Sequence, residues 1–138
     1  MLWMTDHSPT QSKHPRDIHE RLLQFACEIV RTAQFLHRRG PIGRALSYQI
    51  LSAGTSVGAN AAEADSAASR ADFISKMRIA LKEAKETRFR LQLCRRAELL
   101  DDTFDPLIDE SDQLVRVLAT IVHTTIQRTT TQQIRRRG

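Results

Sequence analysis

The sequence predicts an all-α protein whose helices pack as an up-down-up-down antiparallel four-helix bundle. Hydrophobic residues make up 41% of its 138 residues and aromatic residues only 5%, a composition rich in helix-forming residues and poor in strand-forming ones. Four segments also repeat apolar residues every three or four positions, with short connections between them. A chain of this length can form one domain with its own core.

The first two helices are expected over residues 16–38 and 42–65, with Pro41 just before the second. Their apolar stripes have helical spacing and comprise Ile18, Leu22, Phe25, Ile29, Ala33 and Leu36, then Leu46, Ile50, Ala53, Val57 and Ala61. Gly54 and Gly58 lie inside the second stripe, where each costs about 1 kcal/mol of helix propensity relative to Ala. We therefore expect another helix to approach this one closely.

A third helix is expected over residues 69–99, and its spacing predicts two apolar surfaces. The inner seam alternates steps of four and three through Phe73, Met77, Ala80, Ala84, Thr87, Leu91 and Cys94. Ile79 and Phe89 lie outside this seam and add more apolar surface than one bundle face needs. We therefore predict that these two residues belong to an oligomer interface.

The last helix begins near Asp105, and its periodicity is lost after about Thr124. The sequence thus divides into a flexible N-terminal arm over residues 1–15, a bundle over residues 16–126 and a basic C-terminal tail over residues 127–138. The start of the chain lacks a signal-peptide pattern, and no apolar run approaches the roughly 18 residues of a membrane span. A cytoplasmic protein without a membrane partner is expected.

Four segments carry a family resemblance: QI at 49–50, SVGANAAE at 56–63, DFI at 72–74 and IALKEAKET at 79–87. Over residues 18–122 the chain resembles the bacterial four-helix-bundle proteins that are encoded in intervening sequences of large-subunit ribosomal RNA genes. One departure is Ala64, which stands where that family usually has glycine. The turn after the second helix is therefore expected to begin slightly later here.

That family is related to the accessory variability protein of diversity-generating retroelements, a basic homopentameric barrel that associates with a reverse transcriptase and its RNA. The resemblance implies that this chain assembles with itself into a homo-oligomeric ring, a pentamer. It also implies a role as an accessory factor to a reverse transcriptase or another nucleic-acid enzyme.

Polar residues on the second and third helices are expected to meet in their seam. The set comprises Ser56, Asn60, Glu63, Glu83 and Glu86, at helical spacings among small residues. Buried carboxylates and amides cost several kcal/mol unless they are hydrogen-bonded, so a network that joins the helices is the simplest interpretation. A structural role is favoured over a catalytic one, because structural networks also perturb carboxylates.

The sequence predicts no enzyme, no cofactor and no metal site. Di-iron bundles place Glu-x-x-His pairs on one helical face, and no Glu in this chain has a His three residues later. Cys27 and Cys94 have neither a metal-knuckle spacing nor a nearby His, and both are expected to be reduced, buried thiols. Gly54 and Gly58 lie within a helix and lack the lysine of a phosphate-binding loop.

The best functional candidate is basic, in line with a formal net charge of +5. The candidate nucleic-acid-binding residues are Arg78, Lys82, Lys85 and Arg88 on the third helix and Arg135, Arg136 and Arg137 in the tail. A stripe of this kind can follow the phosphates of RNA or DNA with strong salt dependence. The alternative function is a scaffold that binds an acidic protein partner and no nucleic acid. The basic residues can also be explained without any binding function, as a solvated helix face interleaved with Glu83 and Glu86.

Overall fold

A computed structural model of the protein describes residues 15–138. It contains the helices α1 (Pro15–His37), α2 (Gly40–Asp65), α3 (Arg70–Arg96) and α4 (Asp105–Arg137), with a 3-10 turn, η2 (Asp102–Phe104), before α4. No strand occurs in these residues, which confirms the all-α prediction. None of these helices is long and apolar enough to cross a membrane. The predicted N-terminal arm falls, apart from Pro15, outside the described residues.

The helix boundaries have local physical causes. Gly40 has φ +88, a left-handed conformation that costs glycine little, and Pro41 follows in the first turn of α2. Ser69 caps α3, because its hydroxyl accepts a hydrogen bond from the backbone N–H of Asp72 at 3.1 Å. At the other end of α3, Glu98 has φ 63 and turns the chain toward η2.

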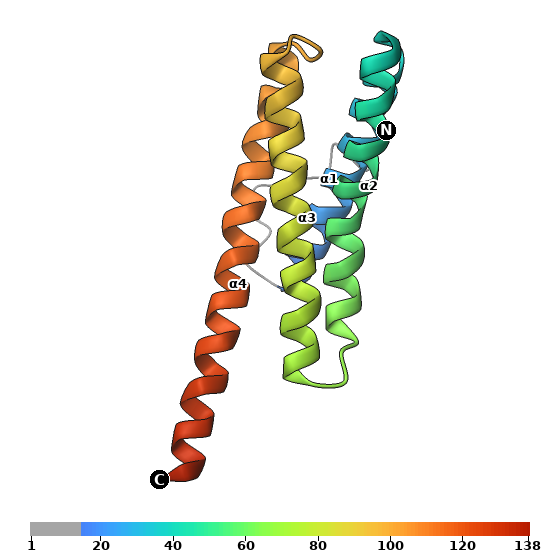
Figure 1. Ribbon diagram of the computed structural model, residues 1–138. Helices are drawn as coiled ribbons and strands as arrows, with labels where there is room; N and C mark the ends of the chain where they lie inside the picture. Colours follow the sequence, from blue (N-terminus) through green and yellow to red (C-terminus); the bar gives the residue numbers. More distant parts are fainter. Residues whose placement is uncertain (1–14) are drawn as a thin grey trace.

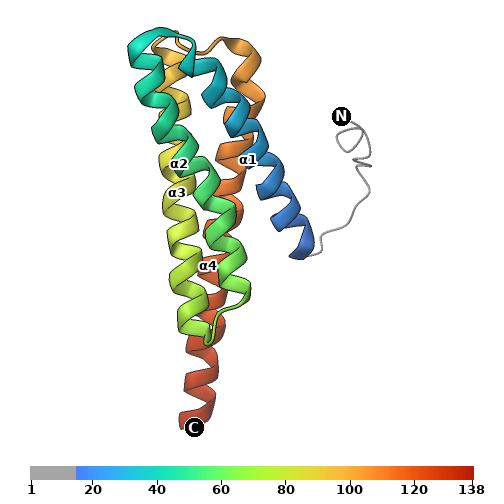
Figure 2. The same ribbon diagram turned by 90° about the vertical axis from the view of Figure 1, so that its right-hand side faces the viewer.

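Each helix packs against the next one in the chain, as two perpendicular views show (Figures 1 and 2). In Figure 1 the turn between α2 and α3 lies at the lower end of these two helices, and the connection between α3 and α4 lies at the upper end of the molecule. Contact between α1 and α4 is much more limited. An ion pair between Arg21 of α1 and Glu110 of α4 nevertheless joins them, with Nη2 and Oε1 2.5 Å apart.

The core confirms most of the predicted apolar stripes. Met77, Ala80, Ala84, Thr87, Leu91 and Cys94 of the α3 seam are buried, and only Phe73 of that seam is partly exposed. Gly54 marks a close approach of α2 to α1, because a Cβ atom there would lie 2.7 Å from both Cγ atoms of Ile29. At Gly58 the nearest atom would be the Cβ of Leu22, at 3.4 Å.

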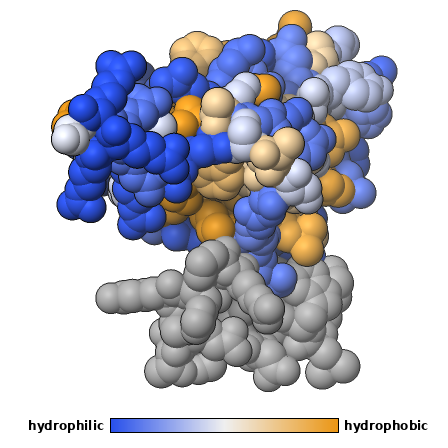
Figure 3. Space-filling view, turned by 90° about the horizontal axis from the view of Figure 1, so that it is seen from below, coloured by the Kyte–Doolittle hydropathy of each residue, from blue (hydrophilic) through white to orange (hydrophobic). Residues whose placement is uncertain are grey.

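Helix α4 is longer than the sequence predicted. Its second half is rich in threonine, and Oγ1 of Thr125 and of Thr129 donates to the backbone carbonyl four residues earlier, at 2.7 and 2.9 Å. The helix continues to Arg137, so the predicted basic tail is helical, and residues 131–138 are all exposed. Figure 1 shows this part of α4 extending below the other helices. Seen from below, hydrophilic side chains gather on the left, where α4 ends (Figure 3).

Candidate nucleic-acid interface

An exposed basic stripe follows the side of α3 opposite its buried seam. Arg78, Lys82 and Lys85 are all exposed, and Arg96 continues the same line toward the end of the helix. Their spacings are sums of steps of three and four residues, which keeps them on one side. For these residues of the described chain, no ion pair with a carboxylate is observed. The stripe therefore presents positive charge to solvent.

The structure separates Arg88 from the other predicted binding residues. Arg88 lies on the α4 side of α3, where its Nη1 is 2.9 Å from Oδ1 of Asp112. Arg95 behaves similarly, with its Nε 2.9 Å from Oδ1 of Asp105, a contact that raises the pKa of Arg95. The acids that begin α4 are thus partly neutralised by the arginines beside them.

Phe89 occupies the middle of the basic stripe. It follows Lys85 by four residues and precedes Arg96 by seven, and 64% of its surface is exposed. Ile79, the other predicted interface residue, is 39% exposed. It lies nearer to α2, because Lys76, one turn earlier on α3, pairs with Glu63 of α2 at 3.1 Å. The two apolar residues therefore have different surroundings.

The predicted arginines at the end of α4 are exposed and lie at one end of the stripe. Arg70, which begins α3, donates from Nη1 to Oε1 of Gln132 at 2.7 Å. Arg135, Arg136 and Arg137 follow within two turns of Gln132. The structure therefore places all three near the end of α3 at which Arg78 lies.

The five predicted network residues make several separate contacts. Within α2, Ser56 Oγ donates to the carbonyl of Ser52 at 2.6 Å, and Asn60 Nδ2 donates to the carbonyl of Ser56 at 2.8 Å. Glu63 instead reaches across to α3 and accepts from Lys76 Nζ at 3.1 Å. A single network that joins all five remains a prediction.

The two glutamates of α3 lie close together. Burial raises the pKa of Glu83, the negative charge of nearby Glu86 raises it further, and Lys82 and Arg90 oppose the rise. Arg90 donates to Oε1 of Gln49 on α2, while its own Nε is buried without a hydrogen-bond partner. The α2–α3 seam thus contains charged groups that are only partly compensated.

A model of the family described as 23S rRNA-intervening sequence protein matches residues 16–120. The chain belongs to this family. It is also similar to the crystal structure of a protein with unknown function from the S23 ribosomal protein family from Bacteroides thetaiotaomicron. The two chains are 39% identical, the match covers 76% of this chain and 97% of that one, and the TM-score is 0.70. No curated protein matches.

The region that matches the intervening-sequence family contains the whole basic stripe of α3 but ends before the exposed end of α4. The sequence resemblance over residues 18–122 is therefore confirmed with nearly the same limits. Ala64, the noted departure from the family pattern, is buried, and α2 ends one residue later at Asp65.

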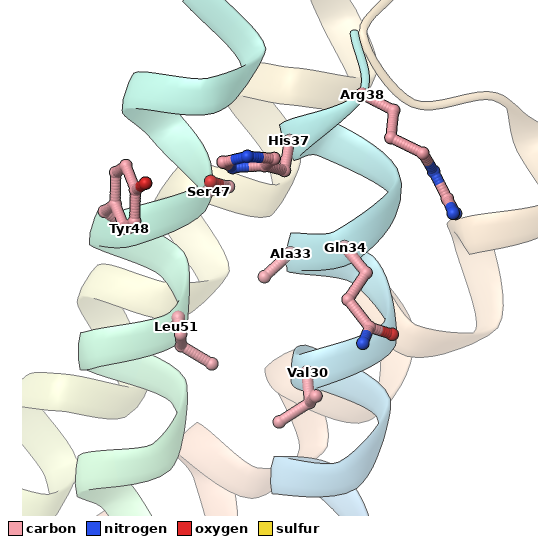
Figure 4. A pocket seen from close by; sticks show the side chains of 8 residues that line it. All are labelled: Val30, Ala33, Gln34, His37, Arg38, Ser47, Tyr48 and Leu51. Atoms are coloured by element: carbon pink, nitrogen blue, oxygen red, sulfur yellow. The ribbon is translucent and has the colours of Figure 1, made fainter.

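Sequence reasoning missed a groove between α1 and α2. Its volume is about 550 Å³, and it is lined by Val30, Ala33, Gln34, His37, Arg38, Ser47, Tyr48 and Leu51 (Figure 4). The rings of His37 and Tyr48 meet edge-on with their centroids 5.8 Å apart, and Tyr48 is 61% exposed. The signal in the sequence was Val30 and Tyr48, two large apolar side chains outside the predicted stripes.

Metal-ligating side chains and the two cysteines are the remaining candidates for chemistry in the described residues. Within residues 15–138, no group of three or more His, Cys, Asp or Glu side chains is arranged to hold a metal ion. Cys27 and Cys94 are free, and burial raises the pKa of the Cys94 thiol. Cys27 is only partly buried, contrary to the expectation that both thiols are buried. A buried thiol with a raised pKa is a poor nucleophile.

Proposed function

We propose that this member of the 23S rRNA-intervening sequence protein family is a non-enzymatic helical bundle that binds RNA or DNA electrostatically through α3. The observation that supports this most is the exposed stripe of Arg78, Lys82 and Lys85, which lacks the carboxylate partners that neighbouring arginines have. The arginines at the end of α4 extend the positive surface. The family description, which refers to a ribosomal RNA intervening sequence, is consistent with an RNA ligand.

Binding of this kind is governed by release of counterions from the phosphates, so affinity falls steeply as salt rises and depends little on sequence. The resemblance to the accessory variability protein supports a role beside a reverse transcriptase or another nucleic-acid enzyme. The stripe would then hold the nucleic acid while the partner performs the chemistry.

The proposal includes self-assembly of an up-down-up-down antiparallel bundle into a homo-oligomeric ring, a pentamer. A closed ring uses head-to-tail contacts, in which two different surfaces of each subunit meet. Exposed apolar side chains occur on two different parts of the bundle, at Ile79 on α3 and around the α1–α2 groove. Five copies of a modest basic stripe would bind one long polynucleotide by avidity.

Native mass measurement tests the ring. The wild-type protein is expected to have the mass of an oligomer, and Ile79→Glu is expected to lower it, because a carboxylate would be buried in the contact. Ile134→Glu is a matched control, since Ile134 is also exposed but lies near the free end of α4. A monomeric wild-type protein would rule out the ring.

A matched pair of charge reversals tests nucleic-acid binding. Lys82→Glu/Lys85→Glu and the control Arg39→Glu/Arg44→Glu both alter exposed cations, and each lowers the formal net charge from +5 to +1 because every reversal removes two charges. Fluorescence anisotropy with labelled RNA at about 50 and 200 mM salt measures affinity. The first variant is expected to lose binding at both salt concentrations, and the control to retain most of it.

Equal losses in the two variants would show that net charge rather than the α3 stripe governs affinity. If the wild-type protein fails to bind RNA or DNA even at the lower salt concentration, the proposal is wrong. The alternative is then a scaffold whose basic face binds an acidic protein.

A further inference from the structure

The geometry points to a single-stranded nucleic acid as the ligand of the α3 stripe, with one base stacked on the ring of Phe89. This inference rests on the proposed function and deepens it by naming the ligand class. Phe89 is exposed over 64% of its surface in the middle of a line of cations, and Leu93, one turn further along α3, is an apolar neighbour that is 42% exposed. Such a combination of aromatic ring and flanking positive charge is what unpaired nucleotides bind.

The dimensions of the stripe suit a strand that runs along the helix. At a rise of about 1.5 Å per residue, Lys85 lies about 6 Å from Phe89 along the axis, and Lys82 and Arg96 lie about 10 Å away on opposite sides. Cations before and after the ring can therefore hold phosphates on both sides of a stacked nucleotide. Phe89 at the centre would fix the strand between them.

A hollow beside the ring gives the base a place to sit. Its volume is about 250 Å³, and Lys85, Glu86, Phe89 and Arg90 line it. Arg90 is held on the α2 side by its hydrogen bond to Gln49. Charged groups at the rim with an aromatic ring among them provide both stacking and polar contacts for a nucleobase.

A duplex would make poor use of this surface. The faces of paired bases are stacked inside the double helix, so a phenyl ring on a convex helix would meet only sugars and phosphates. The cations would still attract the duplex, but Phe89 would contribute little. The difference between the affinities for single-stranded and duplex nucleic acid therefore measures the contribution of the Phe89 side chain.

The position of Phe89 argues against its predicted role in an oligomer interface. An apolar contact centred on this residue would also remove Lys82 and Lys85 from water, and the cores of protein interfaces are depleted in such charges because desolvation is costly. Ile79 lies nearer to α2 and can still take part in a subunit contact. We therefore assign Phe89 to the nucleic acid.

The test compares a labelled single strand of about 16 nucleotides with a duplex of the same length, using the full-length protein at one salt concentration. Phe89→Leu keeps an apolar side chain without the aromatic face, and Phe89→Trp keeps the face. Ile42→Ala is the control, because Ile42 is similarly exposed at 67% but lies at the start of α2, away from the stripe. The native mass of every variant is measured in parallel.

Phe89→Leu is expected to weaken single-strand binding on the order of 5- to 150-fold, to change duplex binding little, and to leave the native mass unchanged. Phe89→Trp and Ile42→Ala are expected to bind single strands as the wild-type protein does. Unchanged single-strand affinity in Phe89→Leu, while Lys82→Glu/Lys85→Glu still abolishes binding, would overturn this inference and leave the proposed function standing. A wild-type protein that binds neither ligand would overturn both.

A lower native mass in Phe89→Leu would also overturn the inference, since it would place the side chain of Phe89 in a contact between subunits.

Discussion

Nη1 of Arg88 lies 2.9 Å from Oδ1 of Asp112, and this ion pair joins α3 to the first half of α4. The other oxygen of this carboxylate, Oδ2, forms an ion pair with Nη2 of Arg116 at 3.0 Å. Arg88 therefore shares a carboxylate on its own protein, whereas Lys82 and Lys85 face solvent. Four cations at regular spacing on one helix thus differ in their availability to a ligand.

Replacement of Arg88 is expected to affect stability rather than binding. Arg88→Gln should lower the free energy of unfolding by less than about 1 kcal/mol, because the ion pair is partly exposed. Its affinity for RNA should match that of the wild-type protein, while Lys85→Gln should bind more weakly. Thermal melting and fluorescence anisotropy measure the two effects. Equal losses of affinity in both variants would contradict the assignment.

Two glycines of α2 are expected to respond in opposite ways to alanine. At Gly54 a new Cβ would lie 2.7 Å from Ile29, so Gly54→Ala should destabilise by about 1 to 3 kcal/mol through overpacking. At Gly58 the nearest atom is 3.4 Å away, so Gly58→Ala should be neutral or stabilise by up to about 1 kcal/mol through helix propensity. Denaturant unfolding compares them, and a stabilised Gly54→Ala would refute the close approach.

Glu83 is expected to make stability depend on pH. Burial and the charge of Glu86 raise its pKa in the folded protein, so the protonated form is favoured there. The folded state then binds more protons than the unfolded state, and its stability falls as pH rises through the raised pKa. Melting temperatures of the wild-type protein and Glu83→Gln should therefore diverge as pH rises above the usual pKa of a glutamate and through the raised pKa of Glu83, with the variant gaining. A constant difference would contradict this prediction.

The two thiols are expected to differ in reactivity. Cys94 is fully buried, and burial raises its pKa, whereas Cys27 is only partly buried. Because the thiolate is the reactive form, a thiol-alkylating reagent should modify Cys27 first in the native protein. Mass spectrometry after timed alkylation measures the order, and denaturant should equalise the two rates. Rapid native modification of Cys94 would contradict its burial.

Removal of residues 131–138 is expected to reduce salt dependence without unfolding the bundle. All eight residues are exposed, so the melting temperature should change little. Three arginines are lost, and if each contacts a phosphate, the slope of log affinity against log salt should become shallower by about 2 for a single strand. An unchanged slope would exclude the end of α4 from the binding surface.

The sequence predicted the bundle well because helical spacing specifies which side of each helix is buried. The α3 seam from Met77 to Cys94 is buried at every predicted position. The end of α4 was missed for a physical reason. Threonine has only modest helix propensity, which argued against a helix in this segment. In the structure the segment is helical, and the hydroxyls of Thr125 and Thr129 donate hydrogen bonds to backbone carbonyls four residues earlier.

The candidate site was less predictable, because spacing along one helix does not reveal what a neighbouring helix offers. Arg88 has the same periodicity as Lys85, and only the position of Asp112 on α4 distinguishes them. Phe89 was grouped with Ile79 as surplus apolar surface, since its place among cations depends on which side of α3 is exposed. Pairing between helices had to be observed before either residue could be interpreted.

The exposed end of α4 also matters for handling the protein. From Gln127 to Arg137 the helix extends by about 15 Å, and its last turns make few contacts with the rest of the fold. A fluorophore or affinity tag attached at Gly138 would thus be carried on a spacer that the chain itself provides, well separated from the packed core. Purification and surface immobilisation can use this end without disturbing the bundle.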